Sequence, residues 1–405
     1  MDYQGAKASG DATSSRPTVG GTENNFDLLR LLAAAQVFHF HATESFHLKY
    51  GPVATAVTEV LNFFPGVPIF FVISGFLISL SYERSLSASS RTSAAIRSYA
   101  RNRFLRIYPG LWVCFAVTVL LLAFAGQLTR GFLRSEFIPW VMCQLTFFQA
   151  FNPSHLRGYG LGVINGSLWT IPVELSFYVA LPVLYWLTGR MSRRASDVIF
   201  GALAIASLII AFANPRFIAP YYPFPSKVLH VTPIPHIYMF LFGVLAQRNF
   251  GRIRGILEGK VVYWTAATVG SMWVDLRLLD HSLENSFLFV LCGRLLLTGF
   301  ALSFAFSARS VSRRLLRHQD ISYGIYIYHA LFINAFIAAG IGGLSAYALA
   351  AVGALAAGMI SWRLVESRAL RRKRGAVVTM LPSATTSKDG TLAAATPLIA
   401  SEPPR

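Results

Sequence analysis

The stretch VLNFFPGVPIFFVISGFLISLSY occupies residues 60–82 and contains no charged side chain. An α-helix needs about 20 predominantly apolar residues to cross a hydrocarbon core ~30 Å thick, so this stretch predicts a membrane-spanning helix. Nine further apolar ranges are drawn on the same ground: 27–47, 107–127, 167–188, 196–213, 234–248, 260–279, 285–306, 321–343 and 345–363. The sequence therefore predicts an all-α polytopic membrane protein with about ten transmembrane helices.

The composition agrees with a membrane protein. The 405 residues are 54% hydrophobic and only 13% charged, whereas soluble domains carry about 25% charge. The net charge of +18 would suggest nucleic-acid binding in a soluble protein, but the basic residues lie between apolar segments, so we expect no nucleic-acid partner. The cysteines lie inside apolar runs and show no metal or redox spacing, so we expect neither a disulfide nor a metal site: Cys114, Cys143 and Cys292.

The lysines and arginines indicate how the chain is oriented. They cluster in alternate loops, at 84–106, 190–194, 248–260, 309–317 and 363–374. These loops and the basic residues of the terminal segments place about 28 of the 36 basic residues on one side of the membrane. The positive-inside rule expects this of the cytoplasmic side. Both termini of this multi-pass protein are therefore predicted to be cytoplasmic.

An additional apolar stretch, 137–151, does not fit this orientation as a crossing. Counting it as a span would move the arginines of 190–194 to the opposite side, so we interpret it as a lipid-interface or re-entrant helix on the outer side. Residues 1–24 are predicted to be a disordered cytoplasmic segment, 25–366 the membrane domain, and 367–405 a basic, then low-complexity, cytoplasmic tail.

Two polar residues in the first helix form a candidate site. Arg30 and His41 are eleven residues apart, or ~16 Å along a helix. An arginine at the cytoplasmic entrance can hold phosphate, and a deeper neutral histidine can take a proton from a hydroxyl. Arg30 alone could also be an ordinary positive-inside anchor.

Glu174 is expected at the same depth as His41, ~9 Å from the outer surface. A carboxylate beside an imidazole would orient it and stabilise the imidazolium. The alternative is a protonated glutamate that makes a helix-packing hydrogen bond.

Other polar groups could serve a ligand. Arg103 and Arg106 lie one helical turn apart in the loop Arg97–Arg106, a spacing that suits a pyrophosphate, although inner-face arginines also meet anionic lipid. Ser74 sits beside Gly75, where small residues permit close helix or ligand approach.

Two later helices add three more candidates. Tyr326 and His329 share one face of their helix. They could line a tunnel for a thioester ligand, or hold the helix of Arg30 and His41 in place by hydrogen bonds. Arg294 lies near mid-membrane and is a functional candidate unless it forms a salt bridge to Glu174 or another acid.

These motifs resemble the acyltransferase-3 family of integral-membrane acyltransferases, which includes O-antigen, exopolysaccharide, Nod-factor and peptidoglycan O-acetyltransferases. The likeness runs from about residue 25 to 365. It rests on Phe26–Arg30 with His41, Phe70–Phe76, the Arg103 and Arg106 pair, Ser167–Thr170 with Glu174, and Ser322–His329.

The resemblance implies a ten-helix enzyme that takes an acyl group from cytoplasmic acetyl-CoA, or another acyl-CoA, and delivers it to a hydroxyl on the outer side. It implies that His41 is catalytic, assisted by Arg30, and that Glu174 is the family's acidic position. We assign the coenzyme to Arg103, Arg106, Ser74, Tyr326 and His329, and the acceptor to the following residues: Ser167, Trp169, Tyr178 and Arg294.

The expected partners are acyl-CoA, a saccharide or glycolipid acceptor, and the lipid bilayer. The sequence leaves open a homo-oligomer, a succinyl or longer acyl group, and a small-molecule acceptor. The rival from another class is a lipid or glycan translocase. Broken helices at matched positions of two halves would favour it, and none is evident.

Overall fold

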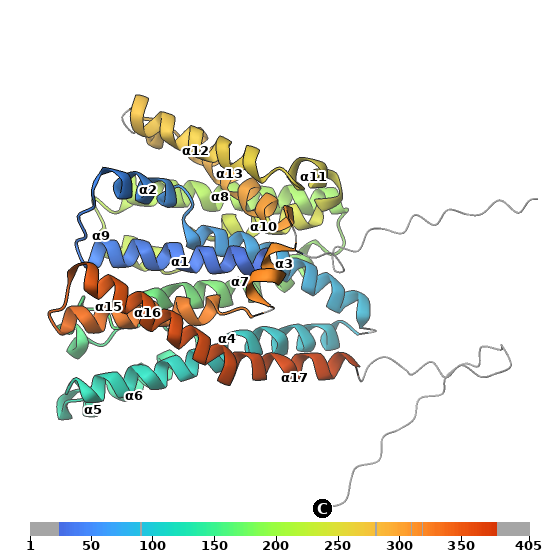
Figure 1. Ribbon diagram of the computed structural model, residues 1–405. Coiled ribbons are helices and arrows are strands. Elements are labelled where there is room, and N and C mark those ends of the chain that lie inside the picture. Colours follow the sequence, from blue (N-terminus) through green and yellow to red (C-terminus); the bar gives the residue numbers. More distant parts are fainter. Residues whose placement is uncertain (1–23, 90, 280–281, 309, 318, 379–405) are drawn as a thin grey trace, which may run out of the picture.

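The computed structural model describes residues 24–378 except 90, 280–281, 309 and 318. Within this part of the chain the protein is helical and has no strand (Figure 1). The principal helices are α1 (Phe26–Ser45), α3 (Gly66–Ala88), α4 (Thr92–Phe124), α7 (Thr170–Thr188), α8 (Arg193–Ala213), α10 (Ile237–Arg248), α12 (Val261–Leu278), α13 (Phe287–Phe306), α15 (Ser322–Ala338) and α16 (Gly343–Ser361).

Shorter helices connect these. They are α2 (Pro52–Asn62), α5 (Arg130–Ser135), α6 (Phe137–Leu145), α9 (Pro223–His230), α11 (Phe250–Leu257), α14 (Val311–Leu316) and α17 (Ser367–Val378). The remaining turns are η1 (Ser154–Leu156), η2 (Gly166–Trp169), η3 (Asn214–Ile218), η4 (Ser282–Asn285) and η5 (Trp362–Glu366). The segment predicted at 1–24 and most of the tail predicted at 367–405 lie outside the described residues.

Each of the ten apolar ranges overlaps one principal helix. Six helical stretches are long and apolar enough to cross a membrane, and α10 and α15 are shorter apolar helices. The chain is therefore a multi-pass membrane protein, as predicted.

The helix α4 differs from the prediction. Residues Arg97–Arg106 were expected to form a loop, but α4 begins at Thr92 and includes them. No glycine or proline interrupts the chain between Thr92 and Tyr108, and arginine, alanine and leucine favour the helix. Consequently Arg103 and Arg106 are held on a rigid element.

The helices α3 and α10 pack closely through glycines. A Cβ on Gly75 would lie 1.9 Å from the Phe240 carbonyl oxygen, and one on Gly243 would lie 2.2 Å from the Val72 carbonyl oxygen. The predicted close approach at Gly75 is confirmed as backbone contact, which only glycine permits.

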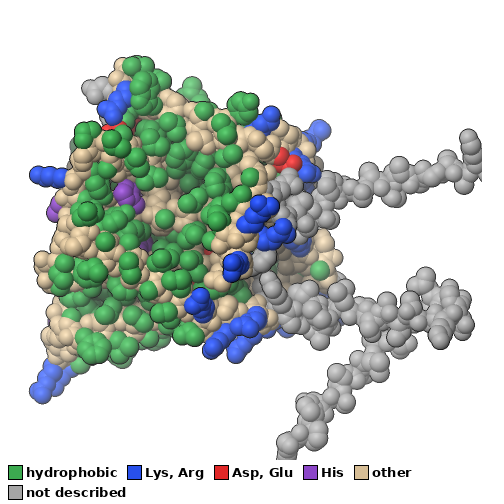
Figure 2. All heavy atoms as spheres, viewed as in Figure 1, with side chains coloured by type: hydrophobic (Ala, Val, Ile, Leu, Met, Phe, Trp, Pro, Cys, Tyr) green, Lys and Arg blue, Asp and Glu red, His purple; other side chains and the backbone are tan. Residues whose placement is uncertain are grey.

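The two ends of the bundle differ in charge. α1 begins and α17 ends at the same end of the molecule (Figure 1). Figure 2 shows lysine and arginine side chains gathered toward that end, while hydrophobic side chains cover the middle. This end is called the inner end below, and the opposite end the outer end.

The stretch 137–151 lies at the edge of the bundle and turns back part of the way along α4. The nine residues of α6 are too few to cross ~30 Å. The Trp112 Nε1 donates to the Leu145 carbonyl at 3.1 Å, and Phe124, the end of α4, lies ~18 Å farther out along that helix. Gln144 and Gln149 satisfy carbonyls at the turn, each donating to the other's backbone oxygen at 3.1 and 3.3 Å. The described segment is thus a re-entrant hairpin rather than a span.

Candidate active site

A cavity lies between α1, α3, α4, α7 and α15, with about 670 Å³ of empty space that includes its opening. Several residues predicted to form the site line it: Arg30, Ser74, Arg103, Arg106, Glu174, Tyr178 and Tyr326. Helices far apart in sequence thus bring most of the predicted site together.

The inner end of this cavity is organised by Asp320, which the sequence analysis missed. One carboxylate oxygen, Oδ2, lies 3.2 Å from Arg30 Nη1 and 2.6 Å from Arg106 Nη2. The other oxygen accepts from the Ser322 hydroxyl. Burial alone would raise the pKa of Asp320, but Arg106, Arg30 and the hydroxyl outweigh it and lower the pKa to about 2. Asp320 is therefore ionised and fixes two guanidinium groups.

Arg103 is placed differently from these two arginines. Its guanidinium lies 5.7 Å from the centre of the Tyr178 ring, and it forms no ion pair with a described residue. Its Nε is buried without a hydrogen-bond partner. A buried donor without a partner is costly, so this arginine is suited to an anionic ligand.

Glu174 contacts groups other than the one expected. The Ser74 hydroxyl donates to its Oε1 at 3.0 Å, and the Tyr178 hydroxyl donates to the same oxygen at 2.5 Å. Across the described chain no hydrogen bond or ion pair joins Glu174 to His41. The expected contact is absent because these two hydroxyls, from α3 and one turn further along α7, hold the carboxylate in the cavity wall.

His41 instead stacks on His329. The two ring centres are 5.5 Å apart and the planes differ by 25°. The Nδ1 of His329 lies 2.7 Å from the Tyr326 carbonyl oxygen, which can only accept, so Nδ1 carries the hydrogen. In the neutral ring the Nε2 is then an acceptor, and it is buried without a partner. Neither histidine lines the first cavity, but the His329 ring contacts Tyr326, which does, with ring centres 5.8 Å apart.

The η2 turn supports this end of the cavity. The Tyr326 hydroxyl is 2.8 Å from Thr170 Oγ1 and donates to the Ser167 carbonyl at 3.3 Å. Ser167 itself is buried and donates to Asn165 Oδ1 at 2.7 Å. Trp169 faces His230 and a separate cavity of about 890 Å³. Ser167 and Trp169 therefore do not line the first cavity.

Arg294 lies apart from the other candidates. It lines a different cavity with residues of α8 and α12, and it forms no salt bridge to Glu174 or another described acid. The predicted acceptor residues thus divide among three places.

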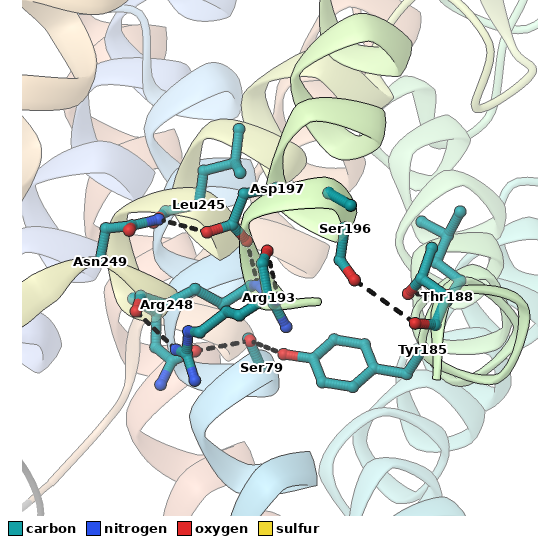
Figure 3. A network of polar contacts seen from close by, with 12 residues as sticks. Ser79, Tyr185, Thr188, Arg193, Ser196, Asp197, Leu245, Arg248 and Asn249 are labelled. Atoms are coloured by element: carbon teal, nitrogen blue, oxygen red, sulfur yellow. Dashed lines mark hydrogen bonds and ion pairs between the residues drawn. The ribbon is translucent and has the colours of Figure 1, made fainter. Parts of the chain in front are cut away.

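A polar cluster at the inner ends of α3, α7, α8 and α10 stabilises the bundle (Figure 3). Asp197 accepts from Arg248 Nε at 2.5 Å and from Asn249 at 2.9 Å. The Ser79 and Tyr185 hydroxyls are 2.9 Å apart. These side chains satisfy one another, so we assign the cluster to structure.

Sequence comparison supports an acyltransferase. Residues 23–363 match the family described as Acyltransferase domain. The chain is 35% identical to Nodulation protein 10 of Rhizobium leguminosarum bv. viciae, over 89% of this chain and 97% of the relative. It is 26% identical to an O-acetyl transferase of Shigella phage Sf6, over 86% and 96%.

A further relative is Exopolysaccharide production protein ExoZ of Rhizobium meliloti, 26% identical over 78% of this chain and 92% of the relative. No solved structure matches the chain. Because the family match covers most of the chain, from before α1 to the end of α16, the protein belongs to the acyltransferase-3 family of membrane acyltransferases.

Proposed function

We propose that this protein is a bacterial inner-membrane O-acyltransferase that moves an acetyl group from cytoplasmic acyl-CoA to a hydroxyl of a cell-envelope or exported glycan. In this proposal the ten principal helices of residues 25–366 cross the membrane, and the inner end is cytoplasmic. The observation that carries it is one cavity with arginines at its inner end and a histidine pair beside its opposite wall. The names of the relatives, O-acetyl transferase and exopolysaccharide production protein, support the acetyl group and the glycan.

The inner end suits the phosphates of coenzyme A. Arg103 has an unused buried donor, and Arg30 and Arg106 are held side by side by Asp320. Arginine recognises phosphate through a fixed fork of donors. Because Arg30 and His41 are ~16 Å apart along α1, a donor held by its phosphates can extend a reactive thioester toward the histidines.

The chemistry assigned to the protein is a proton transfer. His41 takes the proton of the acceptor hydroxyl, the hydroxyl oxygen forms a bond to the acyl carbon, and the carbon–sulfur bond breaks. The imidazolium then returns the proton to the leaving thiolate, so the products are an ester and free CoA. His329, fixed by its bond to the Tyr326 carbonyl, presents Nε2 beside His41 and positions the hydroxyl or the partner ring.

Glu174 takes a different part in this scheme from the one expected. Through Ser74 and Tyr178 it fixes the cavity wall next to Arg103. It is therefore proposed as a positioning residue for the donor, not as the partner of His41.

The test is acyl transfer by purified protein in lipid nanodiscs, with radiolabelled acetyl-CoA and a pool of bacterial cell-envelope glycans. Wild type should label glycan and His41→Ala should not, while both bind CoA. Equal labelling by the variant would remove His41 from the mechanism. No CoA binding by wild type would contradict the enzyme and favour a translocase.

A further inference from the structure

A second cavity lies in the outer half of the bundle, away from the first. It lies between the end of α2, the end of α8, the start of α10, and the adjoining halves of α12 and α13, with about 1330 Å³ of empty space that includes its opening. Its walls include the apolar side chains of Leu208, Phe212, Met272, Phe289 and Val290. The proposed transfer reaction uses none of these residues.

Arg294 faces this cavity without a partner. It is seven residues into α13, so it lies ~10 Å below the outer end of that helix. Its side chain forms no hydrogen bond or ion pair with another described residue, and its neighbours on α13 are apolar except Thr298, whose hydroxyl donates to the Arg294 carbonyl at 2.8 Å. An unpaired charge at this depth is unfavourable and is retained where it serves a ligand.

Arg216 adds a second cationic group to the same cavity. Its guanidinium lies 4.1 Å from the centre of the Phe212 ring, and it donates to the carbonyl oxygens of Phe212 and Glu284 at 3.0 and 2.5 Å. Its Nε is buried without a partner. Two arginines with unused donors therefore line one cavity.

Two carboxylates also line this cavity, Asp275 and Glu284. Asp275 is buried and accepts from the Leu283 backbone N–H at 2.9 Å, which holds η4 against α12. Arg294 is paired with neither of them. Its positive charge therefore remains available to an anion from outside the chain.

The surroundings favour a lipid over a soluble anion. The cavity combines cationic groups with apolar walls, which suits a ligand that has both an anionic head and a hydrocarbon tail. α12 buries only Thr268 and Asp275 and packs at the edge of the bundle against α13 (Figure 1). A tail held between these helices would be next to the membrane interior.

We propose that this second cavity binds the phosphate or diphosphate head of a lipid, with Arg294 as the principal contact and Arg216 as the second. Two sources share this chemistry: an ordinary anionic phospholipid and a saccharide carried on a polyprenyl phosphate. In the second case the site would hold the acceptor of the acyl group on its lipid carrier. Only this second case depends on the proposed acyl transfer.

The experiment is native mass spectrometry of the purified full chain after incubation with phosphatidylglycerol or with a polyprenyl phosphate. Arg294→Gln removes the charge, and Leu276→Trp fills the cavity from α12 without changing any charge. Arg277→Gln is the matched control, because Arg277 is an exposed arginine near the same end of α12 that pairs with Glu59 and does not line the cavity. Thermal unfolding confirms that each variant is folded.

Wild type and Arg277→Gln should retain one phosphate-headed lipid, and both cavity variants should retain at least tenfold less. If wild type retains more polyprenyl phosphate than phosphatidylglycerol, the cavity is a site for the lipid that carries the acceptor. If it retains both lipids equally, the cavity is a site for ordinary phospholipid. No retention by wild type, or equal retention by Arg294→Gln, would overturn the proposal. Acetylation of a soluble glycan is measured in parallel, so failure of the transfer reaction is seen separately from failure of lipid binding.

Discussion

The two ends of the first cavity handle polar groups in opposite ways. At the inner end, Arg30 and Arg106 share one carboxylate, Asp320, which aligns them. At the other end, the stacked rings of His41 and His329 have no carboxylate between them, and His329 keeps an unused nitrogen. Two of the arginines proposed to bind the donor are thus fixed before a ligand arrives, whereas Arg103 and His329 each keep a buried nitrogen without a partner.

The largest effect is expected at the histidine end. His41→Ala should lower acyl transfer about 10³-fold, within the 10²–10⁴-fold that a general base contributes, and should leave CoA binding unchanged. Initial rates with labelled acetyl-CoA measure it. His39→Ala is the control on the same helix, since His39 contacts Tyr347 and Thr58 instead. Full activity of His41→Ala would remove the proposed division between the ends.

The next effect is on stability at the inner end. Asp320→Asn leaves two buried guanidinium groups without their shared anion, and breaking a buried pair costs about 3–5 kcal/mol. Thermal unfolding in detergent measures it. Asp27 is the more exposed acidic partner of Arg30, so Asp27→Asn should lower the free energy of unfolding much less. Equal stability of wild type and Asp320→Asn would show that Asp320 does not organise this end.

The pH dependence follows from the same carboxylate. Its pKa in the folded protein is lowered, so its contribution is present above its ordinary pKa of 3.8 and is lost as the pH falls toward about 2. The stability difference between wild type and Asp320→Asn should therefore shrink as the pH falls below about 4. A difference that stays unchanged down to about pH 2 would contradict this assignment.

A moderate effect on binding is expected at Arg103. Because it has no acidic partner among the described residues, Arg103→Gln should leave stability nearly unchanged. The dissociation constant for CoA should rise about 10–100-fold, as for loss of a hydrogen bond to a charged group of about 1.5–3 kcal/mol. Calorimetric titration measures it, with Arg101→Gln as the control on the exposed face of α4. Unchanged CoA affinity would place the phosphates elsewhere.

The smallest effect is expected between the two ends. Ser74→Ala removes one hydrogen bond to Glu174, about 1 kcal/mol, while the Tyr178 hydroxyl still holds the carboxylate. The KM for the donor should rise a few-fold with kcat nearly constant. A large fall in kcat instead would give Glu174 a direct part in the chemistry.

Much of the fold could be predicted from the sequence because hydrocarbon imposes a simple length rule on helices. Each of the ten ranges overlaps a principal helix, and six helical stretches are long and apolar enough to cross a membrane. The extension of α4 back to Thr92 was missed, because polar residues were taken as a loop although nothing in them breaks a helix. The sequence left two interpretations of 137–151, a helix at the lipid interface or a re-entrant helix. The hydrogen bonds from Tyr108 and Trp112 to the end of the hairpin favour the re-entrant one.

The sequence identified many of the residues that line the cavity, but it did not predict which of them contact one another. Motif positions placed Arg30, Arg106 and Glu174 in one cavity, yet depth along a helix says nothing about which face a side chain uses. Glu174 and His41 therefore share a depth in the prediction but face different partners in the structure. Asp320 had a signal that was not used: two buried arginines require an acid, and this one precedes the Ser322 motif by two residues.

The glycine contact between α3 and α10 limits how the enzyme can open. Helices whose backbones touch cannot slide or separate without losing that contact, so α3 and α10 should move as one rigid body. Ser74, on this rigid body, would keep its place while products leave. We therefore expect any opening of the cavity wall for a bulky acceptor to occur away from the contact between α3 and α10.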